Sequence, residues 1–305
     1  MIDLPAPLYA VEMAQEAGMM QIGPNQTRGG QLSPLPIPRR RSQAEVEAEA
    51  GMERPNLPEQ DRLTACIAKA ARDPQAALAD AQSWVSEGRD AGQNVRANQC
   101  LGLILSNAGD FDGALAAFAQ GVAGVPKEQE VAAVPLMAMA GNAALAGGKA
   151  EEALGWFDRA LAVNGYADNA ALGAVQADRS RALVALGRLA EAGGALDEVH
   201  RLAPEDAEGW LLSATLARRN EDLPRAQRDI EIAAKYAPRD PRIGLEAGVI
   251  AVLDGRDAAA RKSWDSVLAA DPDGETGKVA KSYLEQLGPV PTSGAPSATE
   301  KPAKP

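Results

Sequence analysis

Hydrophobic residues recur every three to four positions through most of the chain, with short breaks between the periodic stretches. In the segment AEGWLLSATLARRN, residues 207–220, this spacing places Trp210 and Ala214 on one face of a helix. After the break EDLP, residues 225–237 carry a second apolar stripe. Because the spacing is that of an α-helix and Pro238 cannot continue one, the pattern predicts two antiparallel helices joined by a short turn.

The same pattern of two helices returns at a regular period. The residues that keep the period are Pro204, Pro238 and Pro272 (34 apart), Gly109, Gly148 and Gly187 (39 apart), and Ala114, Ala153, Ala192, Ala226 and Ala260. Since three residue types hold one register over five units, the chain is predicted to be an array of repeated helix pairs.

The repeated positions resemble those of the tetratricopeptide repeat (TPR). In the unit that begins at Val95, the matching residues are Leu101, Gly102, Leu105, Gly109, Ala114, Phe118 and Pro126. Comparable sets recur in the units that begin at Val134, Gly173, Ala207 and Pro241. A degenerate pair with Ala77 and Trp84 in register precedes them.

The resemblance implies an all-α fold. We expect a right-handed α-solenoid of antiparallel helix pairs, with about six TPR-like units and a C-terminal capping helix at Glu275–Leu287. In such an array, small residues mark the places where helices approach closely, and bulky residues fill the space between pairs. Gly102, Gly141 and Gly248 are expected at the close approaches, with Phe118 and Phe157 among the bulky residues.

Two repeats are longer than the others by five residues. The additions are QEVAA at 129–133 and DNAAL at 168–172, and each precedes a first helix. Both are composed of good helix formers, so we expect each first helix to be lengthened at its N-terminal end by about 7 Å.

The ends of the chain have a different composition from the array. Residues 1–57 are predicted to be a mostly disordered N-terminal segment, and residues 289–305 a disordered tail rich in Pro, Ser, Ala and Lys. The repeat array is expected at 58–288. Within the N-terminal segment, Pro5–Gln21 has the pattern of a short helix, and the sequence leaves open whether it docks onto the array or stays disordered.

Composition and charge narrow the function classes. Of 305 residues, 46% are hydrophobic but only 4% aromatic, so the core must be built mainly from Ala, Leu and Val. The net charge of −11 argues against a nucleic-acid partner, whose binding requires many phosphate contacts. The sequence also predicts no transmembrane segment. On the chain as given no signal peptide is visible, which favours the cytoplasm; a periplasmic location is the alternative if the start is mis-assigned or the chain is a mature form.

A search for catalytic and metal-binding motifs yields no candidate. His200 is the one histidine, and no Ser or Cys motif accompanies it, so it is interpreted as a helix-terminal residue rather than a general base. The lysine of AGGK lacks a phosphate-loop context, because Ala143 and Ala150 stand at required positions. The segment DPDGETGK at 271–278 lacks the ligands of a calcium loop. We therefore expect a protein that is not an enzyme and that has no cofactor and no bound metal.

The resemblance implies that the first helices of the pairs line a concave groove that binds a peptide. The groove residues would be Arg96, Gln99, Leu103, Asn142, Leu145, Arg181, Val184, Leu211, Thr215, Arg218, Arg242, Leu245 and Val249. This lining suits an apolar or amphipathic protein segment that carries a few acidic groups, with Arg as the carboxylate partner. The predicted function is a non-catalytic scaffold or adaptor. The alternatives are a periplasmic or envelope-associated assembly factor and a regulatory subunit of an enzyme complex.

The two cysteines lie in the first helices of two successive predicted pairs. Such helices are neighbours in the stack, and exported bacterial TPR proteins, which this N-terminal pair resembles, make a bridge between Cys66 and Cys100 a reasonable expectation. The register alone does not bring their Cα atoms within bridging distance. Two buried free cysteines are therefore the alternative.

Overall fold

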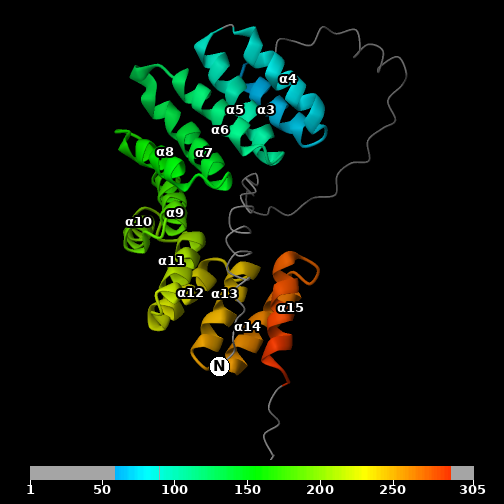
Figure 1. Cartoon of the computed structure of the whole chain (residues 1–305), viewed down its shortest axis with the longest axis vertical. Coiled ribbons are helices and arrows are strands. Elements are labelled where there is room, and N and C mark those ends of the chain that lie inside the picture. Colours follow the sequence, from blue (N-terminus) through cyan, green and yellow to red (C-terminus); the bar gives the residue numbers. More distant parts are fainter. Residues whose placement is uncertain (1–58, 89, 290–305) are drawn as a thin grey trace, which may run out of the picture. The chain divides into compact units, whose positions relative to one another are not determined.

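The structure is a computed structural model that describes residues 59–88 and 90–289 (Figure 1). These residues form thirteen α-helices and one 3-10 helix, with no strand among them. The expected all-α fold of antiparallel helix pairs is confirmed. The expectations for 1–57, including Pro5–Gln21, and for the tail beyond residue 289 concern residues outside the described ranges.

The chain divides into two compact units, Met1–Tyr166 (unit 1) and Ala167–Pro305 (unit 2). The elements of unit 1 are α3 (Glu59–Ala70), α4 (Pro74–Glu87), α5 (Ala91–Asn107), α6 (Phe111–Ala123), the 3-10 helix η1 (Lys127–Ala133), α7 (Val134–Ala146) and α8 (Ala150–Ala162). Those of unit 2 are α9 (Asn169–Ala185), α10 (Leu189–Leu202), α11 (Ala207–Arg219), α12 (Leu223–Tyr236), α13 (Pro241–Leu253), α14 (Asp257–Ala270) and α15 (Glu275–Leu287).

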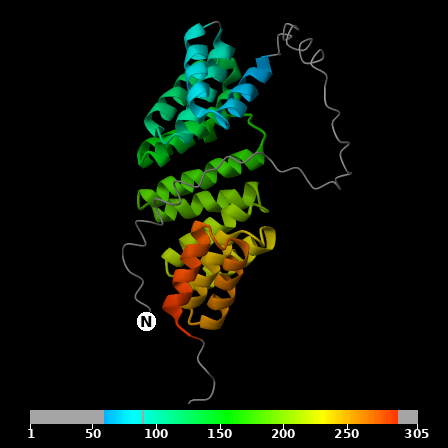
Figure 2. The ribbon, with the colours of Figure 1, turned by 90° about the vertical axis from the view of Figure 1, so that its right-hand side faces the viewer.

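Within each unit, successive helices run antiparallel as pairs, and the pairs stack (Figures 1 and 2). The first helices of the pairs are α3, α5 and α7 in unit 1 and α9, α11 and α13 in unit 2. In unit 2, α11 contacts both α9 and α13 directly, so the first helices share one face of that unit. We call this the first-helix face.

Aspartates fix where most of the helices begin. Seven helices follow an aspartate whose carboxylate accepts a hydrogen bond from a backbone N–H in the first turn: Asp73, Asp90, Asp110, Asp168, Asp206, Asp222 and Asp240. Each such cap contributes about 1 kcal/mol and satisfies a donor that the helix itself leaves unpaired.

Five of the six turns within pairs share one backbone conformation, with a residue of positive φ. Four of them carry a glycine with positive φ at residues Gly109, Gly148, Gly187 and Gly255. The equivalent position between α11 and α12 is Glu221, with φ of 61°. Because a side chain in the left-handed region costs roughly 1–2 kcal/mol, the packing of α11 against α12 imposes this turn against the local preference.

The two five-residue additions have different outcomes. In unit 2, α9 starts at Asn169 and runs for 17 residues, so it is lengthened as expected. In unit 1 the expectation is wrong, because residues 129–133 belong to η1, and α7 begins only at Val134. The physical reason is Pro135, which has no N–H and whose ring clashes with the preceding turn, so it is tolerated only in the first turn of a helix.

The core is built from the residues that keep the period. The five phase-keeping alanines, Ala114, Ala153, Ala192, Ala226 and Ala260, are all fully buried. In five of the six pairs, a small buried residue on the first helix is followed 16 positions later by a large buried residue on the second. These couples are Gly102 and Phe118, Gly141 and Phe157, Ser180 and Leu196, Ala214 and Ile230, and Gly248 and Trp264.

The large members of these couples leave no room for a side chain opposite glycine. A Cβ added at Gly102 would lie 2.5 Å from the Phe118 ring, and additions at Gly141 and Gly248 would meet Phe157 and Trp264 even more closely. The aromatic rings therefore pack directly on the backbone of the first helix. At the end of unit 2, α15 covers α13 and α14 as the expected capping helix, with Tyr283 against Trp264 at 5.1 Å between ring centroids.

A disulfide joins Cys66 on α3 to Cys100 on α5, with 6.4 Å between the Cα atoms. Of the two alternatives for the cysteines, the structure therefore shows the bridge. It ties the most degenerate helix pair to the next one, and in the chain-entropy account a loop of this length contributes about 3–4 kcal/mol to stability.

The close approach of α5 and α6 predicts that an added methyl group lowers the stability at Gly102 on α5 but raises it at Gly155 on α8. Gly102→Ala should destabilise unit 1 by about 1–3 kcal/mol, because Phe118 must move off the α5 backbone. Gly155→Ala on α8 is the matched control, since a Cβ there meets nothing within 4 Å and gains helix propensity of up to about 1 kcal/mol. Chemical denaturation followed by circular dichroism measures both, and equal effects would contradict this packing.

Candidate functional site

The residues expected to line a groove all lie on first helices. Arg96, Gln99 and Leu103 are on α5, Asn142 and Leu145 on α7, Arg181 and Val184 on α9, Leu211, Thr215 and Arg218 on α11, and Arg242, Leu245 and Val249 on α13. The first two helices belong to unit 1 and the other three to unit 2. Ten of the thirteen residues are half-buried, while Arg242 is exposed and Leu211 and Arg218 are buried.

In unit 1, Arg96 and the Oδ1 atom of Asn142 have no partner among the residues that the structure describes. Arg96 makes no hydrogen bond or ion pair with any residue that the structure describes. The Oδ1 atom of Asn142 is buried and has no hydrogen-bond partner among the described residues. Buried polar atoms are nearly always hydrogen-bonded, so an unpaired one requires an explanation.

In unit 2 the arginines are paired with acidic residues of the same unit. Arg181 Nη1 lies 2.6 Å from Asp178 Oδ1, and Arg181 Nη2 lies 2.5 Å from Glu208 Oε1. Arg242 Nη1 lies 2.7 Å from the other oxygen of Glu208, and its Nη2 lies 2.6 Å from Asp240. The hydrogen bond to Asp240 and the charge of Glu208 raise the pKa of Arg242 above its ordinary value. We call these five residues the Glu208 cluster.

A second ion pair in unit 2 is buried. Arg218 on α11 donates from Nε and Nη2 to the two carboxylate oxygens of Glu246 on α13, at 2.6 and 3.2 Å. Only 7% and 9% of the two side chains are exposed, so no ligand reaches this guanidinium without separating the pair. Leu211 likewise lies in the hydrophobic core with Ala214 and Ile230. Neither Leu211 nor Arg218 is therefore part of an accessible binding face.

His200 lies at a helix end, as expected, and stacks on Trp210. The two rings are nearly parallel, with 3.6 Å between their centroids. Burial lowers the pKa of His200, and its Nε2 atom has no hydrogen-bond partner among the described residues. Both cysteines are in the disulfide, so neither is available as a nucleophile for this imidazole.

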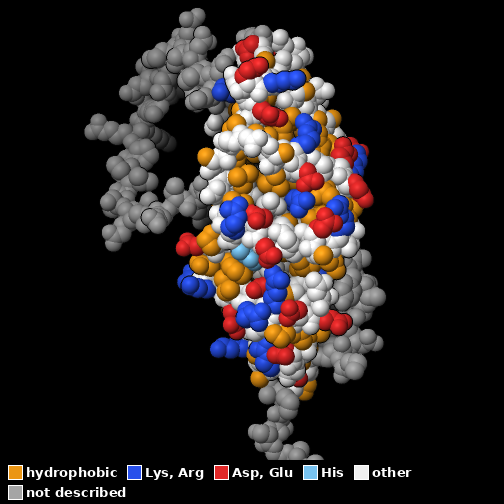
Figure 3. Space-filling view, turned by 90° about the vertical axis from the view of Figure 1, so that its left-hand side faces the viewer, with side chains coloured by type: hydrophobic (Ala, Val, Ile, Leu, Met, Phe, Trp, Pro, Cys, Tyr) orange, Lys and Arg blue, Asp and Glu red, His pale blue; other side chains and the backbone are white. Residues whose placement is uncertain are grey.

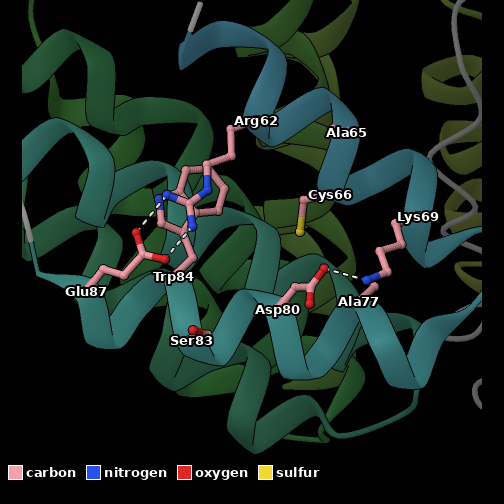
Figure 4. Close-up of a pocket in the computed structure, with 9 residues that line it drawn as sticks. All are labelled: Arg62, Ala65, Cys66, Lys69, Ala77, Asp80, Ser83, Trp84 and Glu87. Carbon is pink, nitrogen blue, oxygen red and sulfur yellow. Dashed lines mark hydrogen bonds and ion pairs between the residues drawn. The ribbon is translucent and has the colours of Figure 1, made fainter. Parts of the chain in front are cut away.

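A pocket of about 310 Å³ lies between α3 and α4 in unit 1 (Figure 4). Two ion pairs cross it, Arg62 with Glu87 at 2.7 Å and Lys69 with Asp80 at 2.5 Å. The guanidinium of Arg62 also lies over the ring of Trp84, 4.4 Å from its centroid. Because its cations and anions pair with one another, the pocket offers no single charge that would select a ligand.

Exposed large hydrophobic residues are scattered over the part of the chain that the structure describes. On the face shown in Figure 3, hydrophobic side chains are interspersed with acidic and basic ones. The large hydrophobic residues exposed in the described ranges are Ile67, Val131, Tyr236 and Leu253, on four different elements. Among the described residues, no three His, Cys, Asp or Glu side chains gather as a metal site would require. No described helix is long and apolar enough to cross a membrane.

The buried ion pair predicts that Arg218 supports stability. Arg218→Ala should lower the free energy of unfolding by about 3–5 kcal/mol, because it leaves the Glu246 carboxylate buried without a partner. Replacing both residues by apolar ones of similar size, Arg218→Met with Glu246→Leu, should restore most of the loss. Arg188→Ala breaks an exposed pair with Glu191 and serves as the control, with an effect below about 1 kcal/mol. Urea denaturation is the measurement; an Arg218→Ala effect as small as that of the control would refute the burial.

Comparison with known proteins adds an independent line of evidence. The tetratricopeptide repeat family model matches residues 101–169 and 211–275. No curated protein sequence matches the chain. Among solved structures, PilW, described as a widely conserved type IV pilus biogenesis factor, is similar with a TM-score of 0.61 and 15% identity, covering 73% of this chain and 98% of that one. PilF of Pseudomonas aeruginosa has a TM-score of 0.57 and 12% identity, covering 74% and 97%.

A third similar structure is itself named as a TPR protein. TTC0263 of Thermus thermophilus has a TM-score of 0.52 and 20% identity, covering 63% of this chain and 98% of that one. At such identities the likeness shows the fold alone. Proteins built from these repeats generally serve as scaffolds for protein interactions. The two matched stretches are tetratricopeptide repeats, and the helix pair between them keeps the same register, with a small and a large residue 16 positions apart.

Proposed function

We propose that this chain is a non-catalytic scaffold that binds segments of other proteins on the first helices of unit 1. The observation that carries the proposal is the pairing state of the polar residues on α5 and α7. Arg96 has no partner among the described residues. Asn142 Oδ1 is buried and accepts no hydrogen bond from any of them. The corresponding arginines of unit 2 are held in ion pairs.

The spacing along each helix supports a continuous binding strip. On α5, Arg96, Gln99 and Leu103 follow one another at intervals of three and four residues, so they share one side of the helix. On α7, Asn142 and Leu145 are three residues apart and share a side in the same way. Each helix thus presents both polar and apolar contacts, all of them half-buried.

This arrangement favours a partner of mixed chemistry. A carboxylate on the partner would form a charge-assisted, two-pronged contact with the Arg96 guanidinium. The Asn142 side chain is half-buried as a whole, so rotation of its amide would let a backbone N–H of the partner satisfy Oδ1. Leu103 and Leu145 supply apolar contact area. The expected ligand is therefore an amphipathic segment with at least one acidic residue.

The proposal predicts which substitutions weaken binding. Peptides selected from a random display library against the full chain serve as probes, and fluorescence anisotropy gives their Kd. Arg96→Glu should raise the Kd of acidic peptides by about tenfold or more, because it replaces attraction with repulsion. Asn142→Ala should raise the Kd of the same peptides by a smaller factor, and the dependence of the Kd on salt concentration should stay the same.

The matched control is Arg201→Glu, which makes the same charge change on the second helix α10, where Arg201 is exposed. It should leave the Kd unchanged. If no peptide is selected, or if the selected peptides bind the Arg96→Glu variant as well as the wild type, unit 1 is not the binding face.

A second inference concerns the compartment. We infer that the protein works in an oxidising compartment as an envelope-associated factor, because disulfides persist there and are reduced in the cytosol. The observation that favours this location is the Cys66–Cys100 bridge between α3 and α5.

Thiol alkylation of the protein in its native cells tests this inference. Cells are quenched in acid, denatured and treated with a maleimide before any reductant is added. The intact mass should show no alkylated cysteine, and two after reduction, because both thiols are in the bridge. Two alkylated cysteines without reductant would place the protein in a reducing compartment.

A further inference from the structure

The Glu208 cluster joins three successive helix pairs of unit 2 through one carboxylate. Glu208 lies in the first turn of α11, Arg181 on α9 and Arg242 in the first turn of α13. One oxygen of Glu208 lies 2.5 Å from Arg181 and the other 2.7 Å from Arg242. A single carboxylate is thus held between two guanidinium groups from neighbouring repeats.

The cluster is accessible, which distinguishes it from the buried pair of Arg218 with Glu246. The side chains of Arg181, Glu208 and Arg242 are 19%, 27% and 42% exposed. Those of Arg218 and Glu246 are almost fully buried. An accessible ion pair contributes little to stability, whereas two guanidinium groups directed at one point are well suited to recognise a carboxylate.

We propose that Arg181 and Arg242 form a second binding site, for a carboxylate of a peptide ligand, and that Glu208 occupies this site as a built-in competitor. The ligand group would be an acidic side chain or a C-terminal carboxylate. Its two oxygens would take the positions that the Glu208 oxygens occupy between the two guanidinium groups. Glu208 then turns out towards solvent, where its charge is hydrated.

The charge count explains why the site is closed at rest. Three carboxylates, of Asp178, Glu208 and Asp240, surround two guanidinium groups, so the cluster has no spare positive charge. As part of the same chain, Glu208 competes at an effective concentration on the order of millimolar or above. A small carboxylate cannot displace it, and only a peptide with further contacts on the first-helix face can.

Removal of the competitor should open the site to a simple probe. Glu208→Gln keeps the size of the side chain but removes its charge, so glutarate should bind the variant at least tenfold more tightly than the wild type. The full chain is titrated with glutarate, and the Nε–Hε NMR signals of its arginines are followed. Those of Arg181 and Arg242 should shift together, while uncharged glutaramide should shift neither.

Three further variants separate the site from nonspecific effects of charge. Glu205→Gln makes the same charge change at an exposed position just before α11 and should leave glutarate affinity at the wild-type level. Adding Arg242→Gln to Glu208→Gln should abolish the gain. Glu208→Asp, whose carboxylate is too short to reach both arginines, should show a smaller gain and serves if Glu208→Gln fails to fold.

Two results would overturn the proposal. One is a glutarate affinity of Glu208→Gln within twofold of the wild type, and the other is a gain that survives Arg242→Gln. Because Arg96 and Asn142 belong to unit 1, peptide binding there is measured separately and can fail or succeed without affecting this outcome.

Discussion

The close approach of the two helices within each pair is the constraint on which the rest of the structure depends. In five of the six pairs, a small residue on the first helix is matched by a large residue 16 positions later on the second, and the larger member is bigger where the smaller one is Gly. Where the small residue is Gly, at 102, 141 and 248, the large one is aromatic: Phe118, Phe157 and Trp264. Where it is Ser180 or Ala214, the large one is the smaller Leu196 or Ile230. Each couple thus fills a similar volume, which lets a core poor in aromatics reach interior density.

The regular geometry of the pairs also places polar groups at fixed distances along the chain. In unit 2, contacts between repeats recur at a separation of 27 to 29 residues: Arg181 with Glu208, Arg218 with Glu246, Arg225 with Asp197, and Arg256 with Gln227. In unit 1, neighbouring pairs are tied by the covalent bridge Cys66–Cys100 and by the ion pair of Lys149 with Asp112. The two units thus stabilise neighbouring pairs by partly different chemistry.

Much of the fold could be predicted from the sequence, because the period fixes helix type, pairing and core at once. The fully buried alanines and the capping helix α15 lie where the repeat register placed them. The start of α7 was missed because helix propensity was weighed for residues 129–133 without the effect of Pro135. Propensity favours a helix only where the next turn can continue it.

The candidate site was less predictable than the fold. The register correctly assigned Arg181, Arg218 and Arg242 to first helices, but it does not show which acidic residues they meet. Glu208, Asp178, Asp240 and Glu246 were not singled out, although opposite charges 27 or 28 residues apart were a readable signal for two of these contacts. Burial of Arg218 depends on the approach of α11 and α13, which is a property of the packed units and not of any one helix.

The Cys66–Cys100 bridge has a mechanical consequence for the chain. If the protein is pulled from its two ends, the force passes directly from Cys66 to Cys100, and the segment between them, including all of α4, carries no load. At about 3.4 Å per extended residue, the 34-residue separation removes roughly 115 Å from the length to which the chain can be stretched. Reduction would restore that length, so the oxidation state of one bond sets how far this protein can extend under tension.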